Sequence, residues 1–144
     1  MNRSWLSHDE DETMAAGREI APLLPPDAVV HLVGDLGAGK TTLARAIATA
    51  LGANPLEVSS PSFAIIHEYP LPDGPSIIHI DGYRLSGQLH EWEEIGIPEI
   101  LRGEGIKLIE WPRHGFEAFG RHNVTIEIRM GGDESREIRM SSES

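Results

Sequence analysis

The alternation of apolar and polar residues divides the first half of the chain into helix-like and strand-like segments. Residues 28–33 form a continuous apolar run, which predicts a buried strand, and residues 40–51 repeat apolar side chains at helical spacing. Before them, Ser7 and Glu10 have the spacing of a capping box, which predicts a helix that begins after Ser7 and ends before Pro25. This half of the chain therefore predicts a helix, a strand and a second helix.

The second half of the chain is richer in strand-like segments. The runs 63–69 and 76–81 flank a Pro-Asp-Gly turn, which favours an antiparallel hairpin, and residues 89–101 resemble short helices broken at Gly96 and Pro98. Further strands are predicted over residues 106–110, 124–130 and, at an edge of the sheet, 136–140, before a tail over 141–144 that we expect to be disordered. This order predicts an α/β fold with a mixed sheet, whose parallel part is centred on the first apolar strand.

Composition limits the kind of protein that this chain can be. With 144 residues, of which 40% are hydrophobic, it has the size and apolar content of one domain spanning residues 1–144. It has no cysteine, which excludes disulfides and thiolate chemistry, and no apolar stretch near the ~18 residues that a membrane span needs. Because the start turns acidic where a signal peptide would be apolar, we expect a cytoplasmic protein that does not contact membranes.

The charge argues against direct binding of nucleic acid. Lys and Arg number 12 against 23 Asp and Glu, a formal net charge of −11, whereas nucleic-acid binders usually present a basic face. We interpret the acidity mainly as a solubility feature. The 7 histidines are scattered without metal-ligand spacing, so we expect no zinc site, and we interpret His31 and His79 as core or edge residues of predicted strands.

A phosphate-binding motif stands between the first apolar strand and the helix that follows it. The sequence Gly-Asp-Leu-Gly-Ala-Gly-Lys-Thr at residues 34–41 fits G-x-x-x-x-G-K-[ST] at every position. Its glycines allow backbone amides to converge on phosphate oxygens, Lys40 supplies a cation for the β and γ phosphates, and the Thr41 hydroxyl suits magnesium. We therefore predict nucleotide binding in a three-layer, P-loop NTPase-like domain. The expected nucleotide-binding residues are Asp35, Leu36, Gly37, Ala38, Gly39, Lys40, Thr41 and Thr42.

Two predicted strands end in carboxylates that suit the metal chemistry of such a loop. Asp81 ends one of them and Glu110 ends the other. Because ligands of open α/β sheets bind beyond the carboxyl ends of the strands, both acids are expected to face the loop. We predict Asp81 on the metal side, directly or through water, and Glu110 either in the metal shell or orienting the attacking water. The predicted catalytic residues are Lys40, Asp81 and Glu110, and the predicted metal-binding residues are Thr41, Asp81 and Glu110.

Three kinds of function fit a nucleotide site in a chain of this size. They are an ATPase subunit of a larger complex, a small-molecule kinase, and a nucleotide-dependent binding module without productive hydrolysis. A kinase normally needs a lid that carries arginines, but the region after Arg102 is short and strand-rich. If Glu110 lies far from the γ-phosphate, the binding module is favoured. Residues 60–62 are predicted as a switch segment or an ordinary turn. Trp111 is predicted either to pack near the nucleotide or, as the favoured interpretation, to lie in the core.

Several segments, taken in order, resemble one protein family. They are GDLGAGKTT, SSPSF, HIDGYRL, EW and IEWP, and their ordered combination is similar to the TsaE family, small bacterial P-loop ATPases of tRNA threonylcarbamoyladenosine synthesis. The resemblance covers most of the chain, from residue 11 through residue 112. A P-loop alone is shared by a great many families, whereas this ordered set is specific.

The resemblance implies cofactors, roles and partners. The cofactors are ATP and magnesium, and the implied activity is an ATPase that is weak alone and is stimulated on binding a TsaB–TsaD heterodimer, with tRNA reached only through that complex. The implied roles are phosphate binding by Lys40, magnesium binding by Thr41, a Walker-B-like acid at Asp81, a metal-shell or catalytic acid at Glu110, and a position near the nucleotide for Thr13.

Overall fold

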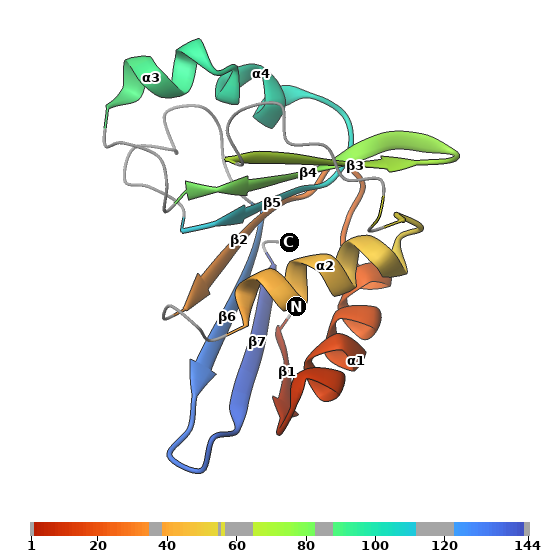
Figure 1. The fold of residues 1–144 in the computed structure, drawn as a ribbon, viewed down its shortest axis with the longest axis vertical. Coiled ribbons are helices and arrows are strands. Elements are labelled where there is room, and N and C mark those ends of the chain that lie inside the picture. Colours follow the sequence, from red (N-terminus) through yellow and green to blue (C-terminus); the bar gives the residue numbers. More distant parts are fainter. Residues whose placement is uncertain are drawn as a thin grey trace.

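The computed structural model describes residues 2–34, 39–54, 56, 65–82, 88–111 and 123–142, and in them the chain forms one mixed sheet with helices on both faces (Figure 1). The strands are β1 (Asn2–Ser7), β2 (Val29–Gly34), β3 (Ile66–Leu71), β4 (Gly74–Asp81), β5 (Lys107–Glu110), β6 (Val124–Met130) and β7 (Arg136–Ser142). The helices are α1 (Glu10–Ile20), the 3-10 helix η1 (Ala21–Leu23), α2 (Lys40–Ala50), α3 (Leu89–Glu94) and α4 (Ile97–Arg102).

The sheet of the described residues has the strand order β1-β7-β6-β2-β5-β4-β3. Strand β2 pairs in parallel with both β5 and β6, and β4 pairs in parallel with β5, so the parallel part is centred on β2 as predicted. The remaining ladders, β3–β4, β6–β7 and β1–β7, are antiparallel. Because β2, β4, β5 and β6 run the same way, their carboxyl ends meet at one edge of the sheet, where ligands of open α/β sheets bind.

The two faces of the sheet are covered by different helices. Helices α1 and α2 pack on one face, where Ile20, Leu43 and Ile47 join side chains of β2 and β6 in a continuous apolar core. On the other face Trp92 of α3 and Ile97 of α4 pack with Val29, Ile80 and Ile109. Successive strand residues alternate between these cores, as the two-residue repeat of a strand requires. The three-layer α/β fold predicted from the sequence is confirmed.

The start of the chain differs from the sequence prediction. Residues 2–7 form β1, a strand that was not predicted, because its two apolar residues, Trp5 and Leu6, are adjacent and give no apolar alternation. The helix cap is Asp9 rather than Ser7, because the Asp9 carboxylate accepts from the Glu12 amide at 2.8 Å. Ser7 is instead the last residue of β1. The capping chemistry was predicted correctly and its position was wrong by two residues.

The end of the chain and helix α4 also differ from the sequence prediction. Strand β7 is not an edge strand, because β1 pairs with it in antiparallel register from Asn2 opposite Ser141 to Ser7 opposite Arg136. Residues 141 and 142, expected in a disordered tail, lie in β7. Pro98 does not break a helix, because it lies in the first turn of α4, where the backbone N–H has no helical partner in any case. The N-cap of this helix is Gly96, with φ of 87°. No helix of the described residues is long and apolar enough to cross a membrane.

Candidate nucleotide-binding site

The described ends of the phosphate-loop motif both need glycine. At the end of β2, a side chain at Gly34 would place its Cβ 2.4 Å from the Ile128 carbonyl oxygen. At the start of α2, Gly39 is the N-cap and has φ of 107°, a left-handed conformation that L side chains avoid. Strand, motif and helix follow one another as predicted. Residues 35–38, which are predicted phosphate ligands, and residues 60–62 lie outside the described part of the chain.

Lys40 is buried at the first position of α2, with 4% of its surface exposed. Its Nζ donates to the Gly34 carbonyl at 2.5 Å and lies 3.6 Å from the centroid of the Trp111 ring. The carbonyl and the ring together hold the ammonium at the carboxyl end of β2. Trp111 is half-buried and lies beside this cation, so of its two predicted positions the structure favours the one next to the phosphate-loop motif over the core.

Glu110, at the carboxyl end of β5, joins the motif directly. The Thr41 hydroxyl donates to the Glu110 carboxylate, with Oγ1 at 3.1 Å from each oxygen. On its other side the carboxylate oxygen Oε2 lies 2.5 Å from His79 Nε2. A carboxylate only accepts, so the imidazole carries its proton on Nε2. The structure thus brings together Lys40, Thr41 and Glu110, which were predicted as one site.

The neighbours of Glu110 decide its charge. Burial of the side chain raises its pKa, but the hydrogen bond and charge of His79, the hydrogen bond of Thr41 and the charge of Lys40 lower it. The net result is a pKa below the ordinary value, so Glu110 is a carboxylate at neutral pH. An anionic carboxylate beside a threonine hydroxyl is the donor pair that a P-loop magnesium ion uses.

Asp81 stands next to Glu110 across the β4–β5 ladder, where the two residues are paired in parallel register. Neighbours paired in this way project to the same face of the sheet, which here is the face covered by α2. The described residues contain no group of three or more His, Cys, Asp and Glu side chains that could hold a metal ion. Two carboxylates and a hydroxyl nevertheless fit magnesium, which usually completes its shell with water and substrate phosphate.

A cleft of about 200 Å³ runs between the first half of α1 and the length of α2 from Thr41 to Thr49. Thr41 and Thr42 line it from α2, and Glu10 and Met14 line it from α1. Thr13 is buried and does not line this cleft; its hydroxyl lies 2.7 Å from the Ser7 hydroxyl and donates to the Asp9 carbonyl. A direct contact of Thr13 with the nucleotide therefore stays a prediction.

His79 is a site residue that the sequence reasoning missed. It is buried in a strand, as predicted, but its partner is the acid of the site and not a core group. The signal was present in the sequence, because His79 precedes Asp81 by two positions and alternate strand residues share a face. Its second nitrogen, Nδ1, is buried without a hydrogen-bond partner in the described part of the chain.

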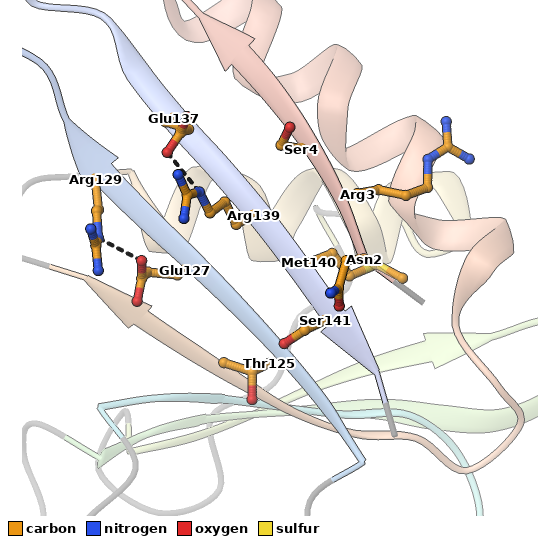
Figure 2. A pocket seen from close by; sticks show the side chains of 10 residues that line it. All are labelled: Asn2, Arg3, Ser4, Thr125, Glu127, Arg129, Glu137, Arg139, Met140 and Ser141. Atoms are coloured by element: carbon orange, nitrogen blue, oxygen red, sulfur yellow. Dashed lines mark ion pairs between the residues drawn. The ribbon is translucent and has the colours of Figure 1, made fainter. Parts of the chain in front are cut away.

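A separate hollow of about 620 Å³ lies on the outer face of β1, β7 and β6, away from α1 and α2 (Figure 2). Four of its charged side chains are paired along their own strands, Arg129 with Glu127 at 2.5 Å and Arg139 with Glu137 at 2.7 Å, and Arg3 lies over the Trp5 ring. The two ion pairs satisfy both acids of this hollow within its own strands. The polar groups of the phosphate-loop edge remain the candidate site.

The sequence model described as "Threonylcarbamoyl adenosine biosynthesis protein TsaE" matches residues 7–138 of this chain. The chain belongs to the TsaE family. Its relatives include the tRNA threonylcarbamoyladenosine biosynthesis protein TsaE of Bacillus subtilis, 37% identical over 139 residues, which are 96% of this chain and 84% of that protein. The TsaE of Streptomyces coelicolor is 38% identical over 125 residues, 85% of this chain and 83% of that protein.

Solved structures agree with this membership. The crystal structure of Bacillus subtilis YdiB superposes with a TM-score of 0.73 at 32% identity, covering 99% of this chain and 86% of that one. The TsaE resemblance read from the ordered motifs is confirmed, and so is the fold class.

Proposed function

We propose that this TsaE-family chain is the ATP-binding and ATP-hydrolysing accessory subunit of the machinery that attaches a threonylcarbamoyl group to the adenosine next to the anticodon of tRNA. The observation that carries the nucleotide part is the meeting of Lys40, Thr41 and the anionic Glu110 at one edge of the sheet. The tRNA part is supported by the names of the relatives, which are tRNA threonylcarbamoyladenosine biosynthesis proteins.

Each residue of the site has a role in this proposal. Lys40 holds the β and γ phosphates of ATP, together with the backbone amides of the motif. Thr41, Asp81 and Glu110 hold magnesium, which when bound neutralises phosphate charge and orients the terminal phosphate. Glu110 completes that shell or orients the attacking water, and His79 fixes the direction in which the Glu110 carboxylate points.

The position of Glu110 favours hydrolysis over a binding module that never hydrolyses its nucleotide. If Glu110 were far from the motif, it could not orient the water that attacks the terminal phosphate. It instead lies within hydrogen-bond distance of Thr41, a residue of the motif. We propose TsaB and TsaD as the partner subunits, with tRNA reached only through them, and the cytoplasm as the compartment. A net charge of −11 suits a protein partner better than direct contact with tRNA.

Steady-state ATPase assays test this proposal. We expect slow turnover by the isolated chain and acceleration on adding a TsaB–TsaD heterodimer, because P-loop enzymes often receive part of their transition-state stabilisation from a partner. Glu110→Gln should lower turnover in the complex while ADP still binds, and Lys40→Ala should abolish binding of both nucleotides. Fast turnover by the chain alone, unchanged by the heterodimer, would contradict the accessory role and favour a stand-alone ATPase or a kinase.

A further inference from the structure

Arg136, the first residue of β7, has a buried nitrogen with no partner. The residue as a whole is half-buried, but its Nε is buried and makes no hydrogen bond in the described part of the chain. A guanidinium has five N–H donors and is always charged, so burying one of them unpaired is unfavourable. A group kept in this state is a candidate for a partner that arrives with a ligand.

This nitrogen lies against the phosphate-loop motif. A Cβ placed on Gly39 would lie 3.7 Å from Arg136 Nε and 3.8 Å from its Cδ. Gly39 immediately precedes the buried Lys40, so two cationic side chains flank one residue of the motif. Strand direction explains the approach: β6 runs parallel to β2, so the hairpin from β6 to β7 turns at the same edge of the sheet as the motif.

Two acids close to Arg136 in the sequence, Asp133 and Glu137, are engaged with other groups. Glu137 projects to the opposite face of β7 and pairs with Arg139, as Figure 2 shows. In the hairpin, the Asp133 carboxylate accepts from the hydroxyl and the amide of Ser135. Two cations beside the phosphate-loop motif, with Asp133 and Glu137 bound to other groups, favour a further negative charge at this place.

We propose that Arg136 is a nucleotide-binding residue that contacts the nucleoside-proximal part of the diphosphate. The inference rests on the proposed nucleotide function and adds a residue to it. In the strand order β7-β6-β2-β5, Arg136 and Glu110 approach the motif from opposite sides of β2. Glu110, with Thr41, marks the side of the metal and the terminal phosphate. Arg136 therefore meets the part of the nucleotide that ATP and ADP share.

Arg136→Met tests this inference, because methionine keeps an apolar stem and removes the guanidinium. Calorimetric titration should show that ATP and ADP both bind roughly 10-fold more weakly or worse, by similar factors, as expected for losing a charge-assisted hydrogen bond. The melting temperature without nucleotide should stay unchanged or rise, because an unpaired buried donor is removed. A residue that only supports the fold would instead lower it. Arg139→Met, on the outer face of the same strand, is the matched control and should bind both nucleotides like the wild type.

The outcomes separate this inference from the proposed function. If the wild type binds ADP and Arg136→Met binds it equally well, the inference is overturned and the proposed function stands. A loss confined to ATP would also overturn it, because Arg136 would then act on the terminal phosphate. No ADP binding by the wild type would overturn both proposals. If Arg136→Met does not fold, Arg136→Gln carries the same comparison, and undiminished ADP affinity in that variant overturns the inference.

Discussion

At the scale of single residues, the charge of Glu110 is linked to the stability of the fold. Burial raises the pKa of its carboxyl. Hydrogen bonds from His79 and Thr41 and the charges of His79 and Lys40 lower it by more, so the pKa lies below the ordinary value of 4.5. A folded-state pKa below the unfolded one stabilises the protein at pH values above the unfolded pKa. That stabilisation is lost as the pH falls through the folded pKa.

Comparison of the wild type with Glu110→Gln should expose this linkage. The free energy of unfolding of the wild type, minus that of the variant, should be constant above about pH 6 and should decrease as the pH falls below about 4.5, by about 1.4 kcal/mol for each unit of pKa depression. Chemical denaturation without metal or nucleotide at several pH values measures it. A difference that stays constant down to about pH 3 would show that folding does not lower the pKa of Glu110.

At the scale of secondary-structure elements, α1 and α2 cross in close contact at Gly17. This residue is buried in the middle of α1, and a Cβ placed on it would lie 2.6 Å from Ala46 Cβ and 3.3 Å from the Ala46 carbonyl carbon. The crossing fixes the start of α2, and with it Lys40 and Thr41, relative to the cleft between the helices. Glycine is a poor helix former, so close packing explains its presence here better than helix propensity does.

Gly17→Ala separates these two explanations by the sign of its effect. Propensity alone predicts a gain of about 1 kcal/mol, whereas the clash with Ala46 predicts a net loss of about 1–3 kcal/mol in the free energy of unfolding. Gly132→Ala is the matched control, since nothing lies within 4 Å of a Cβ at that position. Urea unfolding of the three proteins measures the effect, and a stabilised Gly17→Ala variant would contradict the packing argument.

At the scale of the whole molecule, the sheet places its most constrained strand under the candidate site. Strand β2 is hydrogen-bonded on both sides and buried between two helical layers, whereas β1 and β3 stand at the ends of the strand order. Opening β2 requires the loss of two ladders and of both apolar cores. The residues that lead into the phosphate-loop motif therefore rest on the least mobile part of the described fold.

Amide hydrogen exchange should report this gradient. We expect the slowest exchange in residues 29–33 of β2 and in β5, and the fastest among the strands in β1 and β3, because edge strands open without disturbing the cores. Exchange followed by mass spectrometry on the nucleotide-free protein measures it. Equal protection of β1 and β2 would show that the sheet opens only as a whole.

The sequence by itself determined the elements whose signals are local. The apolar run of β2, the helical spacing of α2, the Pro-Asp-Gly turn between β3 and β4 and the alternation in β6 each depend on neighbouring residues, and the structure confirms them. The motif from Gly34 to Thr41 predicted the candidate nucleotide site for the same reason. Glu110 was predicted beside Thr41 because parallel strands end at one edge, a rule that needs only strand direction.

Only the tertiary structure decided the features that depend on partners distant in sequence. Strand β1 lacks apolar alternation and becomes a strand because β7, more than a hundred residues later, pairs with it. The same pairing removes β7 from the edge and sets Arg136 opposite Ser7, next to Gly39. His79 became a partner of Glu110 through the register of β4 and β5. Periodicity reports which face a residue occupies, whereas the group that it meets there depends on strand order and register.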